Sequence, residues 1–218
     1  MREELLHIEK GQSGEHMKVI GVTGGVGAGK SEALAYLERR RDCRVIMADR
    51  VAHQLEEPGE ACYEPLKALL GTEILDAGGR IDKQKMAARI FGDGELLLKV
   101  NGIVHPAVKA YLTEQIEKER DAGQLSWLFI EAALLIEEGY AGILDELWYI
   151  HADEEVRRQR LRKTRGYTDE KIDAILQKQL SEQAFREHCS VVIENNGTLE
   201  SVYTQIEKEV GEDQWQKR

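Results

Sequence analysis

Cysteines, long apolar runs and an excess of positive charge are all missing or scarce in this chain of 218 residues. Its three cysteines, Cys43, Cys62 and Cys189, stand far apart without C-x-x-C spacing, which argues against a disulfide framework and a zinc site. No apolar stretch approaches the roughly 18 residues that a transmembrane helix needs, and residues 1–15 are too acidic and polar for a signal peptide. We therefore expect a cytoplasmic protein with reduced thiols and no membrane partner.

Basic residues are outnumbered by acidic ones, 30 against 40, so the formal net charge is −10. This balance excludes a broad electrostatic surface for DNA or RNA, and an anionic ligand must meet a local basic pocket. The length suits one α/β domain with small appended subdomains, and no internal repeat or low-complexity linker divides the chain. These features predict no nucleic-acid partner and specify no oligomeric state.

A glycine-rich segment is the most informative part of the sequence. Residues 24–31, GGVGAGKS, complete the pattern G-x-x-x-x-G-K-[ST] between the apolar run 19–22 and a helical stretch over 31–39. The glycines let successive backbone N–H groups face one anion, and the helix N-terminus adds partial positive charge. Lys30 can then reach the β- and γ-phosphates of ATP, and the Ser31 hydroxyl can bind the Mg²⁺ that bridges them. The expected nucleotide-binding residues are Gly25, Val26, Gly27, Ala28, Gly29, Lys30 and Ser31. A glycine-rich turn without a ligand is the alternative interpretation.

Five short apolar runs alternate with helical patterns, which is typical of a buried parallel sheet covered by helices. They lie at 19–22, 44–47, 127–130, 147–150 and 191–193. The predicted fold class is therefore α/β, with a parallel sheet of the P-loop NTPase type. The second and third runs are separated by many more residues than one crossover helix needs. This segment predicts a helical subdomain, with a helical stretch from about residue 82 to 104 and another helix that begins at Pro106.

Two carboxylates follow predicted strands at the edge where open parallel sheets bind ligands. Asp49 follows the second strand, where it can accept a proton from a substrate hydroxyl during phosphoryl transfer; an N-cap for a helix over 50–55 explains it equally well. Glu131 ends the third strand, where it can position Mg²⁺ directly or through water, or be only a solvated strand end. Glu137 and Glu138 lie close by in sequence as competing metal ligands.

A strongly basic helix follows the fourth predicted strand. Its basic residues and those of the next turn are Arg157, Arg158, Arg160, Arg162, Lys163 and Arg165. Arg157 and Arg160 share one helix face, and Arg158 and Arg162 share another, so one face can meet ATP phosphates while the rest is solvated surface. Thr168 then predicts the N-cap of a helix that reaches Leu180.

Two further positions are candidates for ligand contact. His105 stands directly before Pro106 at a predicted helix boundary, where capping or packing is the ordinary role of a histidine and ligand contact is the alternative. Residues 195–197, Asn-Asn-Gly, predict a turn after the last strand. Because this turn also lies at the carboxyl edge of the sheet, Asn195 and Gly197 are candidates for contact with the nucleotide base.

Taken together, these residues resemble the dephospho-coenzyme A kinase family over about residues 17–210. The resemblance is carried by segments 20–31, 48–52, 71–82, 90–93, 103–106, 134–137 and 192–197. It implies phosphorylation of the ribose 3′-hydroxyl of dephospho-CoA, the substrate partner, by ATP with Mg²⁺. It also implies Asp49 as the catalytic base, His105 as part of the CoA-side pocket, and Arg160 with Arg165 closing over the phosphoryl group that Lys30 holds.

The same resemblance implies three parts. These are a nucleotide-binding core (17–50, 126–153 and 182–210), a helical CoA-binding insertion (51–125) and an arginine-bearing lid (154–181), with an extension (1–16) and a tail (211–218). Several positions depart from the family pattern: Met47, Glu131, Ala133, Arg157, Thr164, Phe185 and Ser190. These departures leave two other hypotheses open. One is a different small-molecule kinase, of the nucleoside monophosphate type, and the other is a nucleotide-binding module that has lost catalysis.

Overall fold

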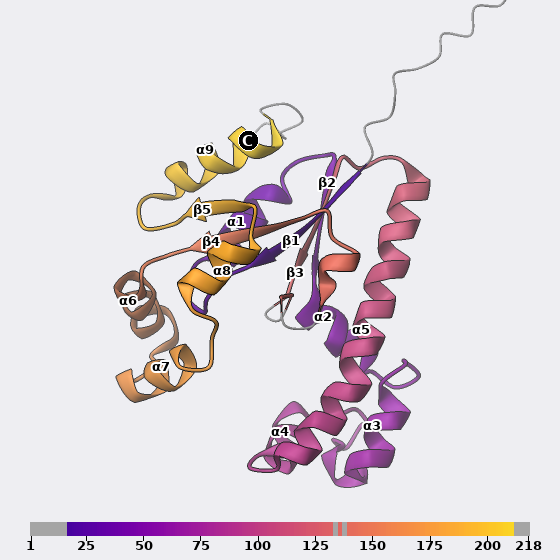
Figure 1. Ribbon diagram of the computed structural model, residues 1–218. Helices are drawn as coiled ribbons and strands as arrows, with labels where there is room; N and C mark the ends of the chain where they lie inside the picture. The colour runs from indigo at the N-terminus through magenta and orange to yellow at the C-terminus, as the bar shows by residue number, and fades with distance from the viewer. Residues whose placement is uncertain (1–16, 133–134, 137–138, 212–218) are drawn as a thin grey trace, which may run out of the picture.

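A five-stranded parallel sheet lies at the centre of the computed structural model, which describes residues 17–132, 135–136 and 139–211 (Figure 1). Its strands run in the order β2-β3-β1-β4-β5. They are β1 (Lys18–Thr23), β2 (Cys43–Met47), β3 (Trp127–Glu131), β4 (Glu146–His151) and β5 (Val191–Glu194). All five predicted apolar runs form strands, each one or two residues longer than expected, so the predicted α/β fold is confirmed.

Helices cover both faces of the sheet, because successive strand side chains point to opposite sides. In β3, Leu128 and Ile130 belong to the apolar cluster beneath α5 (Gly94–Ala122), whereas Phe129 belongs to the cluster beneath α1 (Lys30–Leu37) and α9 (Leu199–Val210). Figure 1 shows α5 on one side of the sheet and α1 with α9 on the other. This double covering explains why the strands read as nearly continuous apolar runs.

The carboxyl ends of all five strands meet at one edge of the sheet, because every pairing is parallel. Glu131 at the end of β3 pairs in register with Val22 of β1 and with Met47 of β2. The glycine-rich segment after β1, Asp49 after β2 and Asn195 after β5 therefore start from the same edge. This is the edge at which open α/β sheets bind their ligands.

The segment between β2 and β3 is helical, as predicted. It contains α2 (Ala48–Leu55), α3 (Tyr63–Leu70), the 3₁₀ turn η1 (Thr72–Ile74), α4 (Lys83–Ile90) and α5. In Figure 1, α3 and α4 lie at the lower end of α5, away from the sheet. One apolar cluster runs from Ile130 in the sheet to Leu66 in α3, so the helices and the core share their interior. The predicted boundaries at 51 and 125 stay a prediction.

Pro106 does not begin a helix, which corrects the expectation of one helical stretch to residue 104 and a second helix from the proline. Helix α4 ends at Ile90, and the single helix α5 starts after Asp93, whose carboxylate accepts a hydrogen bond from the Leu96 N–H at 2.9 Å. Pro106 lies inside α5, where proline costs one backbone hydrogen bond. Val100 and Val108, on either side of the proline, are both buried in the same cluster, and this packing overrides the local preference.

The basic segment after β4 forms α6 (Glu154–Arg165), which is followed by α7 (Asp169–Leu176) and α8 (Glu182–His188). Thr168 caps α7 as predicted, since its hydroxyl accepts a hydrogen bond from the Lys171 N–H. The expectation that this helix reaches Leu180 is wrong. After Leu176 the N–H groups of Lys178 and Gln179 bond three residues back, which tightens the chain into a turn and ends the helix.

Some predictions fall outside the described residues. The extension 1–16, nearly all of the tail, Ala133, and the competing acids Glu137 and Glu138 belong to this group. Within the described part of the chain no helix is long and apolar enough to cross a membrane. Cys43, Cys62 and Cys189 are all free thiols.

Candidate active site

The phosphate-binding loop, defined here as residues 24–31, joins β1 to α1. Gly24, Gly27 and Gly29 have φ angles of 147°, 84° and 90°, which residues with a Cβ rarely adopt. A Cβ on Gly24 would lie 2.4 Å from the carbonyl oxygen of Ile150. No described residue accepts the backbone N–H groups of Gly27, Gly29, Lys30 and Ser31, and no side chain caps α1. The loop therefore presents free donors at a helix N-terminus, the arrangement that binds phosphate.

Lys30 and Glu131 face each other beside this loop. The Lys30 ammonium donates a hydrogen bond to the Gly24 carbonyl at 2.8 Å and lies 3.7 Å from a Glu131 carboxylate oxygen. Burial lowers the pKa of Lys30, although attraction to Glu131 opposes the shift. Burial likewise raises the pKa of Glu131, against the attraction of Lys30. Both charges are thus held partly out of water, where their interactions with a bound polyanion and cation are stronger than at the surface.

Asp49 lies in the first turn of α2, one residue inside the helix. The helix begins at Ala48 and its N-cap position is Met47, so the interpretation of Asp49 as the N-cap is wrong. Its carboxylate is exposed and makes no hydrogen bond or ion pair with a described residue. It is close enough to Lys30 and Glu131 to influence the pKa of each. An unengaged carboxylate beside the phosphate-binding loop is available to a substrate hydroxyl.

One cavity of about 700 Å³ unites most of the predicted site residues. Those in its lining are Gly25, Val26, Gly27, Gly29, Lys30, Ser31, Asp49, Glu131, Arg160, Arg165, Asn195 and Gly197. Ala28 is buried beneath the loop, so its contribution is limited to the backbone. Leu161 and Leu199 also line the cavity and were not predicted, because nothing separates them in sequence from ordinary apolar helix residues.

Arg160 and Asn195 are hydrogen-bonded to each other and to the backbone of the phosphate-binding loop. The Arg160 guanidinium donates to the Ala28 carbonyl at 3.3 Å and to the backbone and side-chain oxygens of Asn195 at 2.9 and 3.2 Å. The buried Asn195 amide donates to the same Ala28 carbonyl at 2.8 Å. The prediction that Asn195 and Gly197 contact the nucleotide base stays a prediction. Both residues line the cavity, and the Asn195 side chain is hydrogen-bonded to the loop and to Arg160.

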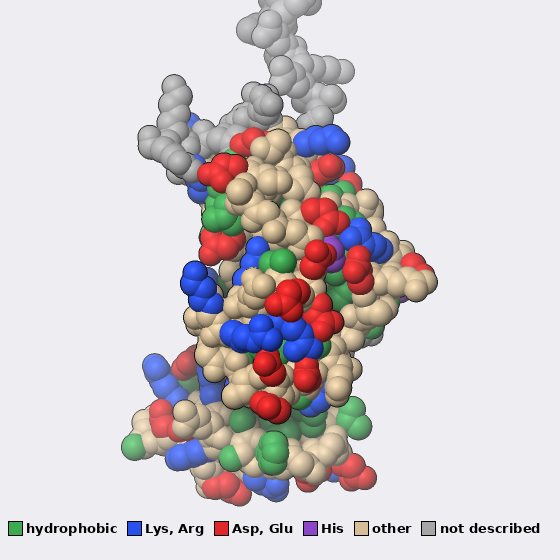
Figure 2. Space-filling model, turned by 90° about the vertical axis from the view of Figure 1, so that its left-hand side faces the viewer, with side chains coloured by type: hydrophobic (Ala, Val, Ile, Leu, Met, Phe, Trp, Pro, Cys, Tyr) green, Lys and Arg blue, Asp and Glu red, His purple; other side chains and the backbone are tan. Residues whose placement is uncertain are grey.

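The two predicted faces of the basic helix differ as expected. Arg157 and Arg160 contact the phosphate-binding loop, whereas Arg158 pairs with Glu154 and Asp173, and Arg162 pairs with Asp169. Arg165 is exposed and lies in the cavity lining, with its guanidinium 5.9 Å from the Tyr167 ring centre. Figure 2 shows basic and acidic side chains intermixed across this face of the molecule rather than gathered into one basic surface.

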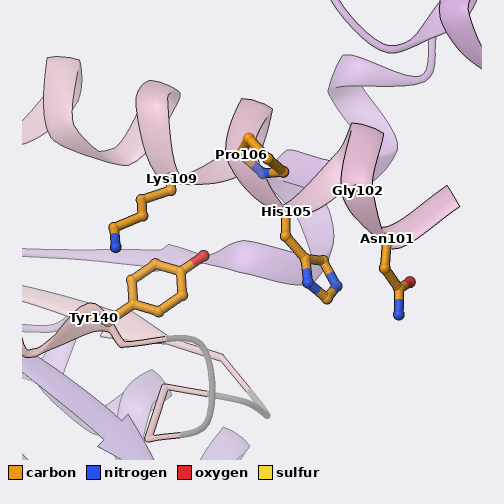
Figure 3. Close-up of a pocket in the computed structure, with 6 residues that line it drawn as sticks. All are labelled: Asn101, Gly102, His105, Pro106, Lys109 and Tyr140. Carbon is orange, nitrogen blue, oxygen red and sulfur yellow. The ribbon is translucent and has the colours of Figure 1, made fainter. Parts of the chain in front are cut away.

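His105 lies in a different cavity from the phosphate-binding loop. This second cavity has about 340 Å³ and is lined by Asn101, Gly102, His105, Pro106, Lys109 and Tyr140 (Figure 3). The expected helix boundary at His105 is wrong, since the residue projects from the middle of α5. Figure 3 shows His105 and Asn101 on one side of the helix, with Lys109 facing Tyr140. Tyr140 belongs to η2 (Tyr140–Gly142), which follows β3, so this cavity lies between α5 and the chain beyond Glu131.

The large cavity offers oxygen donors for a metal ion. The described residues contain no cluster of three or more histidine, cysteine, aspartate or glutamate side chains suited to a metal. Ser31 and Glu131 nevertheless both line the cavity and provide a hydroxyl and a carboxylate. Mg²⁺ prefers this type of site, because it takes few protein ligands and completes its octahedron with water and phosphate oxygens. The residues present therefore fit a magnesium ion bound together with a nucleotide.

Comparison with known proteins agrees with this geometry. The family model of dephospho-CoA kinases matches residues 18–201. The chain belongs to the dephospho-CoA kinase family. Dephospho-CoA kinases from Shouchella clausii and Streptococcus mutans are 32% and 33% identical to it, over 86% and 88% of this chain and 94% and 96% of theirs.

Solved structures show the same fold. TT1252 from Thermus thermophilus aligns with a TM-score of 0.75 at 30% identity, over 91% of this kinase and 98% of that chain. Dephospho-CoA kinase from Campylobacter jejuni aligns with a TM-score of 0.62 at 18% identity, over 90% of this kinase and 97% of that chain. The predicted resemblance, the P-loop kinase fold and the prediction of a kinase are therefore confirmed.

Five of the positions that depart from the family pattern lie either in the lining of the large cavity or in contacts that support the fold. Met47 and Glu131 line the large cavity, and so does Thr164, whose hydroxyl donates back to the Arg160 carbonyl at 2.7 Å. Phe185 stacks on Tyr149 with ring centres 4.7 Å apart, and the Ser190 hydroxyl donates to the Leu147 carbonyl at 3.3 Å. The last two thus support the fold of the kinase rather than the cavity.

Proposed function

We propose that this kinase transfers the γ-phosphoryl group of ATP to the ribose 3′-hydroxyl of dephospho-CoA, giving CoA and ADP. The observation that carries the proposal is the single cavity that brings the phosphate-binding loop together with Asp49, Glu131 and Arg160. Family membership supplies the identity of the acceptor. The free thiols support the further proposal that the enzyme works in the reducing cytoplasm.

The loop binds the nucleotide through its unengaged backbone N–H groups and the N-terminus of α1. Lys30 leaves its hydrogen bond with the Gly24 carbonyl and places its ammonium against the β- and γ-phosphates. Ser31 and Glu131 hold Mg²⁺, which neutralises part of the phosphate charge when it is bound. Because Lys30 and Glu131 are largely buried, little solvent screens their charges.

Asp49 orients the acceptor hydroxyl and takes its proton. The hydroxyl oxygen forms a bond to the γ-phosphorus as the bond between that phosphorus and the β,γ-bridging oxygen breaks, and the proton passes to the Asp49 carboxylate. The absence of a hydrogen bond from any described residue leaves this carboxylate ready to accept it. Asp49 follows β2 directly, so the end of the sheet fixes the position of its backbone.

Arg160 and Arg165 supply positive charge from α6 as the phosphoryl group moves between the oxygens. Arg160 is preorganised by three hydrogen bonds to Ala28 and Asn195, whereas Arg165 is exposed at the cavity rim. A guanidinium fork suits the spread charge of the transition state. Arg160 therefore acts from a fixed position, and Arg165 acts when α6 and α7 close over the bound substrates.

The second cavity, at His105, belongs to the acceptor side in this proposal. It lies between α5 and the chain that follows the end of β3, next to the edge of the sheet where Asp49 and Glu131 lie. Lys109 places a cation in its lining, which suits the diphosphate of dephospho-CoA, and His105 and Asn101 offer further hydrogen bonds. Residues 51–125 would then form the part of the protein that recognises CoA.

Product identification tests the proposal. Purified protein is incubated with ATP, Mg²⁺ and dephospho-CoA, and the products are separated and weighed by mass spectrometry. CoA and ADP should form together, and a Lys30→Ala variant should form neither above background. Phosphorylation of a nucleotide with dephospho-CoA inert, or tight binding of both substrates without turnover, would refute the proposed reaction.

A further inference from the structure

Arg157 contacts the phosphate-binding loop and lies outside the lining of the large cavity. Its Nε donates to the Val26 carbonyl at 3.1 Å, and its Nη2 donates to the Gln179 side-chain oxygen at 2.7 Å. A Cβ on Gly25 would lie 2.6 Å from the guanidinium carbon, so only glycine lets the two groups lie this close. A Cβ on Gly27 would lie 3.1 Å from the Arg157 carbonyl oxygen. The start of α6 therefore rests directly against the loop.

Both hydrogen-bond partners of Arg157 are uncharged. They are neutral oxygens, and no ion pair joins Arg157 to a carboxylate among the described residues. Its neighbours on α6 differ, because Arg158 and Arg162 pair with acids of α6 and α7. Partial burial lowers the pKa of Arg157, although the nearby Tyr149 and Glu154 oppose the shift. The positive charge of Arg157 lowers the pKa of Lys30 across the loop.

An anion bound by the loop would relieve this imbalance. Arg157 and Lys30 carry like charges and repel each other, and a polyphosphate placed on the loop attracts both. The hydrogen bond to the Val26 carbonyl also fixes the Val26–Gly27 peptide, where the backbone must keep the curvature that aims its N–H groups at phosphate. Gln179, just after α7, holds the other end of the guanidinium and so orients it.

We propose that Arg157 is a positioning residue for nucleotide binding, which fixes the Val26–Gly27 peptide through its carbonyl and contributes a positive charge that the polyphosphate of ATP neutralises. The inference rests on the proposed function only in that ATP is the ligand of the loop. Arg157 lies outside the lining of the large cavity, so it acts through the loop rather than by touching the transferred group. Gln179 assists by orienting the Arg157 guanidinium through its hydrogen bond.

Calorimetric binding of ATP, measured without acceptor, separates the two contributions of Arg157. Arg157→Gln removes the charge and retains hydrogen-bonding capacity, and it should raise the Kd for ATP about fivefold at low salt, with a smaller increase at 0.5 M salt. Arg157→Met removes both and should raise that Kd about 30-fold. Gln179→Leu leaves the guanidinium unoriented and should raise it about threefold. Arg158→Gln is the matched control on the solvated face of the same helix, and it should leave ATP binding unchanged.

Binding of dephospho-CoA and the melting temperature distinguish positioning from general damage. Wild-type Kd for dephospho-CoA in Arg157→Gln, together with weaker ATP binding, supports the proposal. Equal loss of both affinities with a lowered melting temperature, or ATP binding unchanged in Arg157→Met, overturns it. If Arg157→Met does not fold, the comparison of Arg157→Lys with Arg157→Gln decides, since only the lysine keeps the charge and should bind ATP more tightly. A wild-type protein that binds ATP but makes no CoA would refute the reaction and leave this test intact.

Discussion

Removing the Asn195 side chain should damage both the fold and the nucleotide site, because this buried amide joins two elements that are distant in sequence. Its Nδ2 donates to the Ala28 carbonyl in the phosphate-binding loop at 2.8 Å, and its Oδ1 accepts from Arg160 at 3.2 Å. Only 2% of the residue is exposed, so these bonds are largely shielded from solvent. The perturbation is Asn195→Ala.

The expected loss of stability follows from the number of hydrogen bonds that the substitution removes. Ala28 keeps a weaker hydrogen bond from Arg160 at 3.3 Å, and Arg160 keeps the Asn195 backbone oxygen at 2.9 Å, so neither group is left wholly unsatisfied. Two side-chain hydrogen bonds are then lost, the one to Ala28 and the one from Arg160, which together cost about 2 kcal/mol. For a domain of this size that corresponds to a fall in melting temperature of about 4–8 °C. The loosened loop and guanidinium should raise the KM for ATP about fivefold.

Thermal melts and steady-state kinetics measure both effects. The matched control is Asn196→Ala, in the neighbouring exposed residue, whose side-chain oxygen accepts a hydrogen bond from the Asp153 N–H at 2.7 Å. That variant should lose less than about 1 kcal/mol and keep its KM for ATP. A melting temperature and KM for Asn195→Ala that match those of Asn196→Ala would refute the reasoning that Asn195 organises the loop.

Three further predictions concern the loop, the thiols and the second cavity. Gly29→Ala should destabilise the protein by at least about 2 kcal/mol more than Gly59→Ala, as measured by urea unfolding. Both glycines have φ near 90°, but at Gly29 the added Cβ would lie 2.2 Å from the Asn195 amide nitrogen, whereas at Gly59 it would meet no described atom within 4 Å. Equal losses of stability in the two variants would contradict this contact. Burial raises the pKa of Cys43 to about 12 and that of Cys189 to about 11. Both thiols should therefore resist iodoacetamide at pH 8, and their contribution to stability should be present below about pH 9 and lost as pH rises through about 11 to 12; rapid alkylation of the folded protein at pH 8, followed by mass spectrometry, would contradict this. His105→Ala should raise the KM for dephospho-CoA about tenfold and leave the KM for ATP unchanged, and an opposite pattern in steady-state kinetics would place His105 on the nucleotide side.

Much of the fold could be predicted because its signals are local. The five strands are buried on both faces and therefore appear in the sequence as apolar runs. The loop after β1 needs glycines at fixed positions because its backbone adopts positive φ angles there. The long helix α5 could not be predicted in the same way. Pro106 signals a boundary locally, yet packing of Val100 and Val108 against the sheet and insertion outweighs that signal.

The same difference between local signals and long-range contacts applies to the candidate site. The lining of the large cavity was largely predictable, because most of its residues belong to the loop motif or lie near the end of a strand, and parallel pairing brings these ends to one edge. Arg160 and Arg165 come instead from the basic helix α6, whose composition marks it in the sequence. The supporting contacts were not predictable, since Asn195 meets Ala28 across 167 residues and Arg157 meets Val26 across 131. No periodicity or spacing in a sequence specifies such long-range hydrogen bonds. His105 was predicted as a contact residue, and only the structure showed that its cavity is separate.

The most direct test of the proposed phosphoryl transfer is the kcat of an Asp49→Asn variant with ATP, Mg²⁺ and dephospho-CoA. Asp49 is exposed and does not cap α2, so the variant should keep its melting temperature and its Kd for ATP. Loss of a positioned general base should lower kcat about 10²-fold or more. A folded Asp49→Asn protein with unchanged ATP binding and near-normal kcat would contradict the account and shift the role of base to Glu131.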